Sequence, residues 1–141
     1  MTLLEQLDIK HPIFLAPMAG VSTPQLAAEV SNQGGLGSLG LGASSVEAAR
    51  QQILETQVLT HQPFQVNFFC HQSSALDHDV AKQWIEYLSP QFEKYNAAPP
   101  TELECIYPSF LDHDDYLNLV LETKPDQVTL VPDVVGQITS N

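Results

Sequence analysis

Residues 11–45 of the chain read HPIFLAPMAGVSTPQLAAEVSNQGGLGSLGLGASS, and this stretch decides the fold class. An apolar run at residues 13–18 predicts a strand, and residues 19–22 predict the loop that follows it. A second apolar run at residues 36–41 predicts another strand, and its glycines indicate close approach by other backbone segments. The helix-forming stretch between the two runs completes a strand-helix-strand order, which is typical of β/α units.

Helix signals support the same order. Thr23 fits a helix N-cap with Pro24 at the first helical position, and the glycines at residues 34–35 fit the end of that helix. Ser44 and Glu47 have the spacing of a capping box and predict the start of the second helix. The remaining predicted elements are the rest of that helix to about residue 60, a strand over residues 64–70, an inserted helix over 79–95, a helix begun by Asp112 or Asp114, and a strand over 128–131. Tyr116, Leu117, Val120 and Leu121 are expected on the buried side of the last helix.

Four parallel strands joined by helical crossovers make about half of a (β/α)8 barrel, which typically needs about 250 residues. A small doubly wound sheet is the alternative, because the sequence does not distinguish a curled sheet from a flat one. The predicted class is therefore α/β, with parallel (β/α) units that form about half of a TIM barrel. Residues 1–141 are predicted to be one incomplete barrel domain.

Composition excludes several classes of partner. The 141 residues carry 17 acidic and 5 basic side chains, and the net charge of −12 repels phosphate backbones and anionic membrane surfaces. We therefore expect no nucleic-acid partner and no membrane partner. The N-terminus has neither the positive charge nor the long apolar run of an export signal, so the expected location is cytoplasmic, with Cys70 and Cys105 as reduced thiols.

Other side chains offer little chemistry in this pattern. The five histidines show no HxH or HExxH spacing, so no metal site is expected. His71 follows the third predicted strand directly and is the only histidine placed toward the end of the barrel where active sites form. Cys70 beside it has no base or cation in the sequence to activate it, which favours a structural thiol.

Two stretches resemble a known family. Residues 11–45 and the run PFQVNFFCHQ at residues 63–72 closely resemble the opening of class I nitronate monooxygenases. The resemblance continues through the inserted helix and covers about residues 3–121, and the pairing of APMAGVS with VNFF is its most specific part. It implies a TIM barrel that binds FMN at the carboxyl ends of its strands and oxidises alkyl nitronates, as its small-molecule substrates, with molecular oxygen.

The resemblance also implies where the cofactor binds. Ala16, Pro17 and Met18 match the end of the first strand, which lies beside the flavin ring in this family, and Asn67 matches an asparagine that hydrogen-bonds the ring. A carboxamide offers a donor and an acceptor, which suits the mixed edge of an isoalloxazine. Apart from the family, Asn67 would be a turn or cap residue and Met18 a core residue, and Phe68 is predicted to be core in either case.

The resemblance weakens near the end of the chain. The family's fourth strand is expected to read like VVSFHFG, whereas residues 124–141 read KPDQVTLVPDVVGQITSN and contain no histidine. That stretch is similar to pyridoxine 5′-phosphate synthase, in which Asp133 would match an acidic catalytic position. The ordinary alternative for Asp133 is a turn after a buried strand. A sequence junction within residues 107–124 would account for both resemblances.

Two hypotheses about function follow. In the first, the chain is the N-terminal part of an FMN-dependent nitronate monooxygenase. The family's catalytic histidine and phosphate-binding loops are then expected beyond residue 141, so no catalytic residue is assigned here, and the chain alone should be inactive and retain FMN weakly. In the second, the chain is a truncated or chimeric non-catalytic half-barrel, or a piece of a pyridoxine 5′-phosphate synthase-like barrel. Its first and fourth strands would expose open edges, which favours a homodimer.

Overall fold

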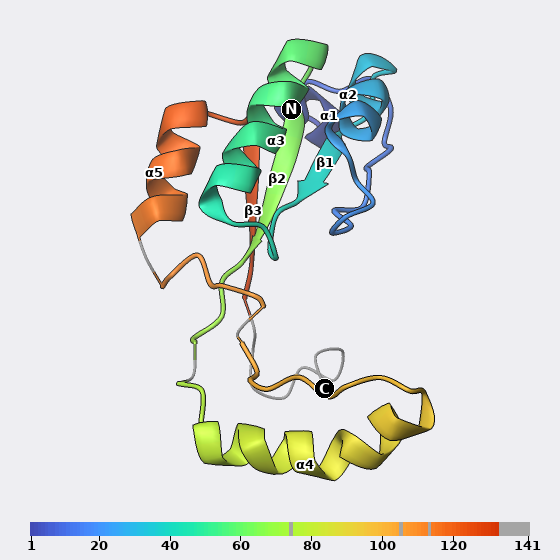
Figure 1. Ribbon diagram of the computed structural model, residues 1–141. Coiled ribbons are helices and arrows are strands. Elements are labelled where there is room, and N and C mark those ends of the chain that lie inside the picture. Colours follow the sequence, from blue (N-terminus) through green and yellow to red (C-terminus); the bar gives the residue numbers. More distant parts are fainter. Residues whose placement is uncertain (74, 105, 113, 133–141) are drawn as a thin grey trace. The chain divides into compact units, whose positions relative to one another are not determined.

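A computed structural model describes residues 1–73, 75–104, 106–112 and 114–132 of the chain. The chain divides into two compact units, one of residues 1–73 with 107–141 and one of residues 74–106. The elements in chain order are α1 (Leu3–Leu7), α2 (Pro24–Asn32), β1 (Gly37–Gly40), α3 (Val46–Leu59), β2 (Phe64–Phe69), α4 (His78–Lys94), α5 (Asp114–Thr123) and β3 (Gln127–Val131) (Figure 1).

The three strands form one parallel sheet in the order β1-β2-β3 (Figure 1). In the register, Gly40 of β1 lies beside Asn67 of β2, and Asn67 lies beside Thr129 of β3. Each strand therefore pairs with the one before it, and helices connect them. The parallel β/α class predicted from the sequence is confirmed, and the sheet is open rather than closed into a barrel.

The first predicted strand is much shorter than expected. The prediction of a strand over residues 13–18 was wrong, because this segment joins the sheet only through a parallel bridge between Phe14 and Leu36. The Leu15 amide donates to the Leu36 carbonyl at 2.9 Å, and the Leu36 amide donates to the Ile13 carbonyl at 2.8 Å. Pro17 has no amide hydrogen with which to extend the ladder. The segment nevertheless runs parallel to the chain at Leu36, which directly precedes β1.

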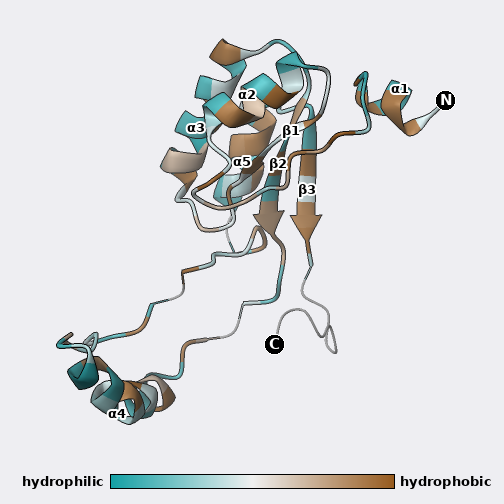
Figure 2. Cartoon of the chain, turned by 90° about the vertical axis from the view of Figure 1, so that its right-hand side faces the viewer, coloured by the Kyte–Doolittle hydropathy of each residue, from teal (hydrophilic) through white to brown (hydrophobic). Residues whose placement is uncertain are grey.

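Helices α2, α3 and α5 cover one face of the sheet (Figure 2). Alternate residues along β2 point to that face, and Phe68 is only 2% exposed there, as predicted for a core residue. A Cβ added to Gly37 would lie 2.1 Å from the Ala27 carbonyl oxygen, so α2 packs directly on β1 as the glycines indicated. The buried cluster between helices and sheet contains Ala27, Leu39, Leu41, Ala49, Ile53, Phe64, Val66, Phe68, Tyr116 and Leu119.

The helix ends agree with the sequence in one case and differ by one residue in another. Thr23 is the N-cap of α2, and its hydroxyl accepts a hydrogen bond from the Leu26 amide at 3.2 Å. Ser45 rather than Ser44 is the N-cap of α3, so the predicted capping box was wrong. The hydroxyl of Ser44 instead accepts a hydrogen bond from the Gln52 side chain at 3.3 Å.

The last helix starts at Asp114, which makes that residue the first helical position rather than the cap. Asp112 accepts a hydrogen bond from the Ser109 amide at 2.8 Å, in the turn before the helix. The buried residues of α5 are Tyr116, Leu119 and Thr123, whereas Leu117 and Leu121 are exposed, contrary to the predicted buried side.

The N-terminal helix α1 was not predicted from the sequence. Thr2 and Glu5 form a capping box at its start. Its residues Gln6 and Leu7 line a hollow together with Leu36 and Gln127, which lie at or just before the amino-terminal ends of β1 and β3. α1 therefore lies near the amino-terminal edge of the sheet.

The unit of residues 74–106 contains α4 and agrees with the predicted inserted helix. Asp77 is its N-cap and accepts hydrogen bonds from the Asp79 and Val80 amides at 3.0 Å. Trp84 and Tyr87 are exposed on this helix and make an edge-to-face contact with ring centroids 5.6 Å apart. Among the helices that the structure describes, none combines the length and the apolar character needed to cross a membrane.

Candidate functional site

The carboxyl ends of the strands meet at one edge of the sheet, which we call the carboxyl edge (Figure 1). It is formed by four segments: residues 40–45 and 69–73 continue from the carboxyl ends of β1 and β2, residues 16–22 follow the bridge at Phe14, and residues 107–112 lead into α5 and bond to Phe69. In parallel β/α folds, ligands bind at this edge, because the strand-to-helix loops converge there. All four residues predicted from the family to contact the cofactor lie at or next to this edge.

Gly40 connects the two predicted parts of the site. A Cβ at Gly40 would lie 2.9 Å from both the carbonyl oxygen of Pro17 and the amide nitrogen of Ala19. Gly40 also pairs in register with Asn67 on the neighbouring strand. The turn after the first segment and the end of β2 are therefore brought together, although they are separated by about 50 residues of sequence.

Asn67 lies on the face of the sheet opposite the helices, because it alternates with Val66 and Phe68, which belong to the core. Asn67 is 9% exposed. Among the residues that the structure describes, none forms a hydrogen bond with its carboxamide, which is therefore available to a ligand. The alternative interpretation of Asn67 as a cap is not supported, since its carboxamide caps no described helix.

Gln65 lies two residues earlier on the same face, and both ends of its carboxamide form hydrogen bonds. Its amide nitrogen donates to the hydroxyl of Ser38 on β1, and its carbonyl oxygen accepts from the hydroxyl of Thr129 on β3 at 3.0 Å. This polar bridge joins all three strands directly beneath Asn67. Sequence reasoning missed it, because its partners are separated by 27 and 64 residues and neither position has a local signal.

The turn that carries Ala16, Pro17 and Met18 is exposed, and Met18 itself is 40% exposed. Met18 is therefore not a core residue, which removes the alternative interpretation of that position. Ser22 closes this turn from within: it is 4% exposed, and its hydroxyl donates to the Ala16 carbonyl at 2.7 Å and accepts from the Met18 amide at 2.9 Å.

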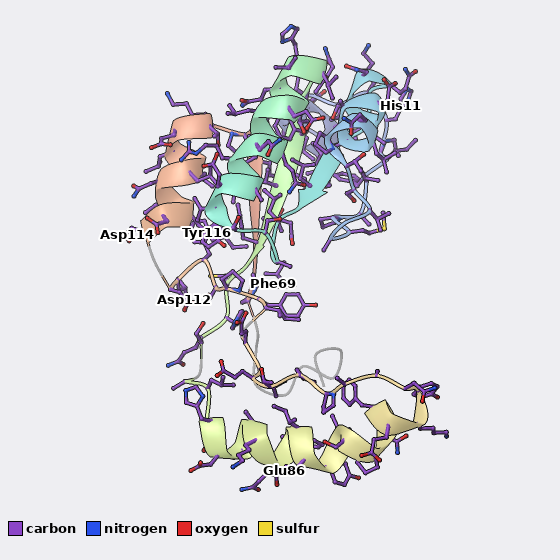
Figure 3. All side chains as sticks on the ribbon, in the orientation of Figure 1. His11, Phe69, Glu86, Asp112, Asp114 and Tyr116 are labelled. Atoms are coloured by element: carbon purple, nitrogen blue, oxygen red, sulfur yellow. The ribbon has the colours of Figure 1, made fainter. Side chains whose placement is uncertain are left out.

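Aromatic side chains line the end of β2 at the carboxyl edge, where Phe69 is labelled in Figure 3. The Phe69 ring makes edge-to-face contacts with Tyr107, with centroids 5.4 Å apart, and with His71, with centroids 6.4 Å apart. The His71 carbonyl accepts a hydrogen bond from the Ser109 hydroxyl at 2.6 Å. His71 thus lies on the predicted side of the fold, and Cys70 is bound into the sheet by its amide, which donates to Val131 at 2.8 Å.

The carboxyl edge lacks basic side chains. The four segments of the carboxyl edge contain no lysine or arginine. Arg50 of α3 forms an ion pair with Glu122 of α5 and is thereby engaged in joining two helices. Within the described ranges, no group of three or more His, Cys, Asp or Glu side chains is arranged to hold a metal ion. Cys105, His113 and Asp133 lie outside the described residues.

Tyr116 links the helix layer to the carboxyl edge (Figure 3). Its hydroxyl donates to the Ser44 carbonyl at 2.8 Å, and its ring packs on Phe68 with centroids 5.4 Å apart. Burial raises the pKa of Tyr116, and the nearby Asp112 and Asp115 raise it further. The hydroxyl is therefore protonated at neutral pH and serves as a structural donor.

An open parallel sheet with a helix layer on one face defines an α/β protein built from the parallel β/α units that make up TIM barrels. The chain belongs to the nitronate monooxygenase family, whose family model matches residues 1–131. This match includes residues 124–131, part of the stretch for which a second resemblance was stated, and it provides no support for that resemblance.

Relatives and a solved structure agree with the family. A nitronate monooxygenase of Paraburkholderia phytofirmans is 54% identical over 123 residues, which cover 87% of this chain and 34% of that protein. One from Pseudomonas aeruginosa is 46% identical over 123 residues, 87% of this chain and 35% of that protein. The crystal structure of nitroalkane oxidase from Streptomyces ansochromogenes superposes with a TM-score of 0.72 at 30% identity, covering 92% of this chain and 35% of that one. The chain spans about a third of the length of these relatives.

Proposed function

We propose that this chain supplies the flavin-ring side of an FMN site in a nitronate monooxygenase that oxidises alkyl nitronates with molecular oxygen. Ala16, Pro17 and Met18 would lie along the ring, and Asn67 would hydrogen-bond its polar edge. The observation that carries the proposal is the carboxamide of Asn67, which forms no hydrogen bond with the described residues; Asn67 is 9% exposed and pairs in register with Gly40, which lies against the Pro17 turn.

The residues fit the ring of the cofactor better than its phosphate. An isoalloxazine presents both donors and acceptors along one edge, and a carboxamide can satisfy both. The FMN phosphate needs cationic side chains or a convergent set of backbone amides. The carboxyl edge of this chain has no lysine or arginine, and the net charge of −12 opposes an anion. The phosphate would therefore have to be held by protein outside this edge.

Bound FMN would supply the redox chemistry, taking electrons from the nitronate and passing them to oxygen. The described residues of this chain would orient the ring and exclude water from one of its sides. We assign no catalytic acid or base to the chain, and expect the 141 residues alone to bind FMN weakly and to be inactive with nitronates.

A comparison of two flavins tests the proposal. FMN and riboflavin share the ring and differ in the phosphate, so a chain that holds only the ring should bind both with affinities within about 3-fold of each other. The affinities would be measured by quenching of flavin fluorescence, with absorbance at 300–550 nm as the record of a bound ring. No binding of either flavin at millimolar concentration would contradict the proposal.

Asn67→Leu is the matching variant. It removes the donor and acceptor at similar volume and should weaken both flavins about 3- to 10-fold, the usual effect of one hydrogen bond. Asn118→Leu on the exposed side of α5 is the control for the same chemical change away from the carboxyl edge. If the two variants bind flavin equally well, Asn67 is not a ligand of the ring.

A second candidate function is self-association of the half-barrel. Within the described part of the chain, β3 pairs with β2 only, so its outer edge offers unpaired backbone groups. A second copy could pair with this edge and form a dimer. Light scattering over a range of protein concentrations tests the idea, because a monomer at every concentration would argue against it.

A further inference from the structure

We propose that Ser22 is a positioning residue that fixes the Pro17 turn in the conformation that faces the flavin ring, with Gly40 leaving the space in which the turn sits. The inference rests on the proposed function, because it names what holds the ring-facing backbone in place. Neither Ser22 nor Gly40 is itself expected to touch the flavin.

The hydroxyl of Ser22 joins both sides of the turn. It donates to the Ala16 carbonyl at 2.7 Å and accepts from the Met18 amide at 2.9 Å, so the peptide groups before and after Pro17 are bound to one oxygen atom. The backbone amide of Ser22 also donates to the Met18 carbonyl at 2.9 Å. Since the Pro17 ring already restricts its own φ, these three bonds leave the turn little freedom.

Ser22 is buried, unlike the residues of the turn that it holds. The residue is 4% exposed, while Ala16, Pro17 and Met18 around it are exposed. The hydroxyl therefore lies beneath the turn and the ring-facing atoms lie above it. If the hydroxyl were lost, the Ala16 carbonyl and the Met18 amide would be free to turn toward solvent, and the surface that meets the ring would change.

Gly40 defines the other side of the turn. A Cβ there would lie 2.9 Å from the carbon and oxygen of the Pro17 carbonyl, which is closer than side-chain atoms approach backbone. A side chain at Gly40 would push the turn away from the sheet. It would also move the turn away from Asn67, which is the register partner of Gly40. Ser22 holds the turn in shape, and Gly40 sets its distance from β2.

The chain offers a close control for the role of Ser22. Thr23, the next residue, also uses its hydroxyl in a short-range bond, as the N-cap of α2. Removing that hydroxyl weakens the helix but leaves the bonds within the Pro17 turn in place. Ser22→Ala and Thr23→Ala therefore separate an effect on the turn from a general loss of stability.

Two measurements test the inference on the 141-residue chain. Amide hydrogen exchange, followed by NMR without flavin, should be at least about 5-fold faster at Met18 in Ser22→Ala than in the unaltered chain and unchanged there in Thr23→Ala. Affinity for riboflavin and FMN, measured by fluorescence quenching, should fall about 3- to 10-fold in Ser22→Ala. Gly40→Ala should lower the affinity at least as much while it keeps the Ser22 hydroxyl.

The outcomes distinguish this inference from the proposed function. Unchanged exchange at Met18 in Ser22→Ala would overturn the inference whether or not flavin binds. Faster exchange with unchanged flavin affinity would also overturn it and would leave the proposed function standing. If the unaltered chain bound no flavin, the proposed function would fail, and with it the role toward the ring. The exchange rates would then still show whether Ser22 holds the turn.

Discussion

The two faces of the sheet differ in chemistry, although they are built from the same strands. On β2, Phe64, Val66 and Phe68 point into the helix layer and are almost completely buried, whereas Gln65 and Asn67 alternate with them and point the other way. The helix face is closed by apolar packing, and the opposite face is joined by hydrogen bonds or left open to a ligand. We conclude that the helix face provides most of the stability, and the opposite face carries the proposed site.

The largest loss of stability should come from a substitution on the helix face. Phe68→Ala should lower the free energy of unfolding by about 3–5 kcal/mol, because the ring is fully packed between Phe110 and Tyr116. Phe69→Ala removes the same ring one residue later, on the opposite face, and should cost clearly less. Urea unfolding followed by circular dichroism measures both variants. Equal losses would remove the distinction between the faces.

A smaller difference in stability should distinguish substitutions of the two amide side chains on the face opposite the helices. Gln65→Leu should cost about 1–3 kcal/mol, because it leaves the hydroxyls of Ser38 and Thr129 without their shared partner. Asn67→Leu should change stability by less than about 1 kcal/mol, because no described residue loses a hydrogen bond. The same urea titration compares them. A greater loss from Asn67 than from Gln65 would show that Asn67 has a structural role instead.

A modest effect at neutral pH is expected where the helix layer meets the carboxyl edge. Tyr116→Phe should cost about 1 kcal/mol through the lost bond to the Ser44 carbonyl. Because burial and two aspartates raise the pKa of Tyr116 above its ordinary value of 10.0, the folded chain keeps the phenol proton at a pH at which the unfolded chain loses it. The free energy of unfolding should therefore fall as pH rises above about 10.

Tyr116→Phe should make that alkaline loss of stability shallower, as measured by urea unfolding at pH 8, 9, 10 and 11. Tyr95→Phe, at an exposed position, is the control for general effects of alkaline pH. An identical pH dependence in both variants would show that the hydroxyl of Tyr116 does not contribute.

Much of the fold could be predicted because its signals are local. Thr23 followed by Pro24 predicts the start of α2, and the apolar run around Val66 predicts β2. Both signals can be read locally, because helix caps and buried strands depend on neighbouring residues. The errors occurred where a local signal was ambiguous. Two adjacent serines fit the start of α3, and Ser45 rather than Ser44 is the N-cap, with its hydroxyl accepting a hydrogen bond from the Ala48 amide.

The site was predicted only as far as family resemblance reached. Pro17 and Asn67 were placed by their motifs, and the structure brings them together through Gly40. The Gln65 bridge and the hydroxyl of Ser22 were missed, because nothing in a sequence states which distant or buried oxygen a polar side chain will meet. Leu117 and Leu121 were wrongly assigned to the core for a similar reason: the apolar pattern allowed two faces of α5, and contact with α3 selected the one with Leu119.

The order β1-β2-β3 has a consequence for how the chain acquires its structure. Each strand finds its hydrogen-bonding partner in the strand made just before it, so the sheet can grow by addition at a single edge as the polypeptide leaves the ribosome. Among the three described strands, none has to wait for a later segment to be synthesised before it pairs, apart from the first of them. Domains generally fold from the N-terminus during synthesis, and this arrangement allows each new β/α unit to assemble on a template that already exists.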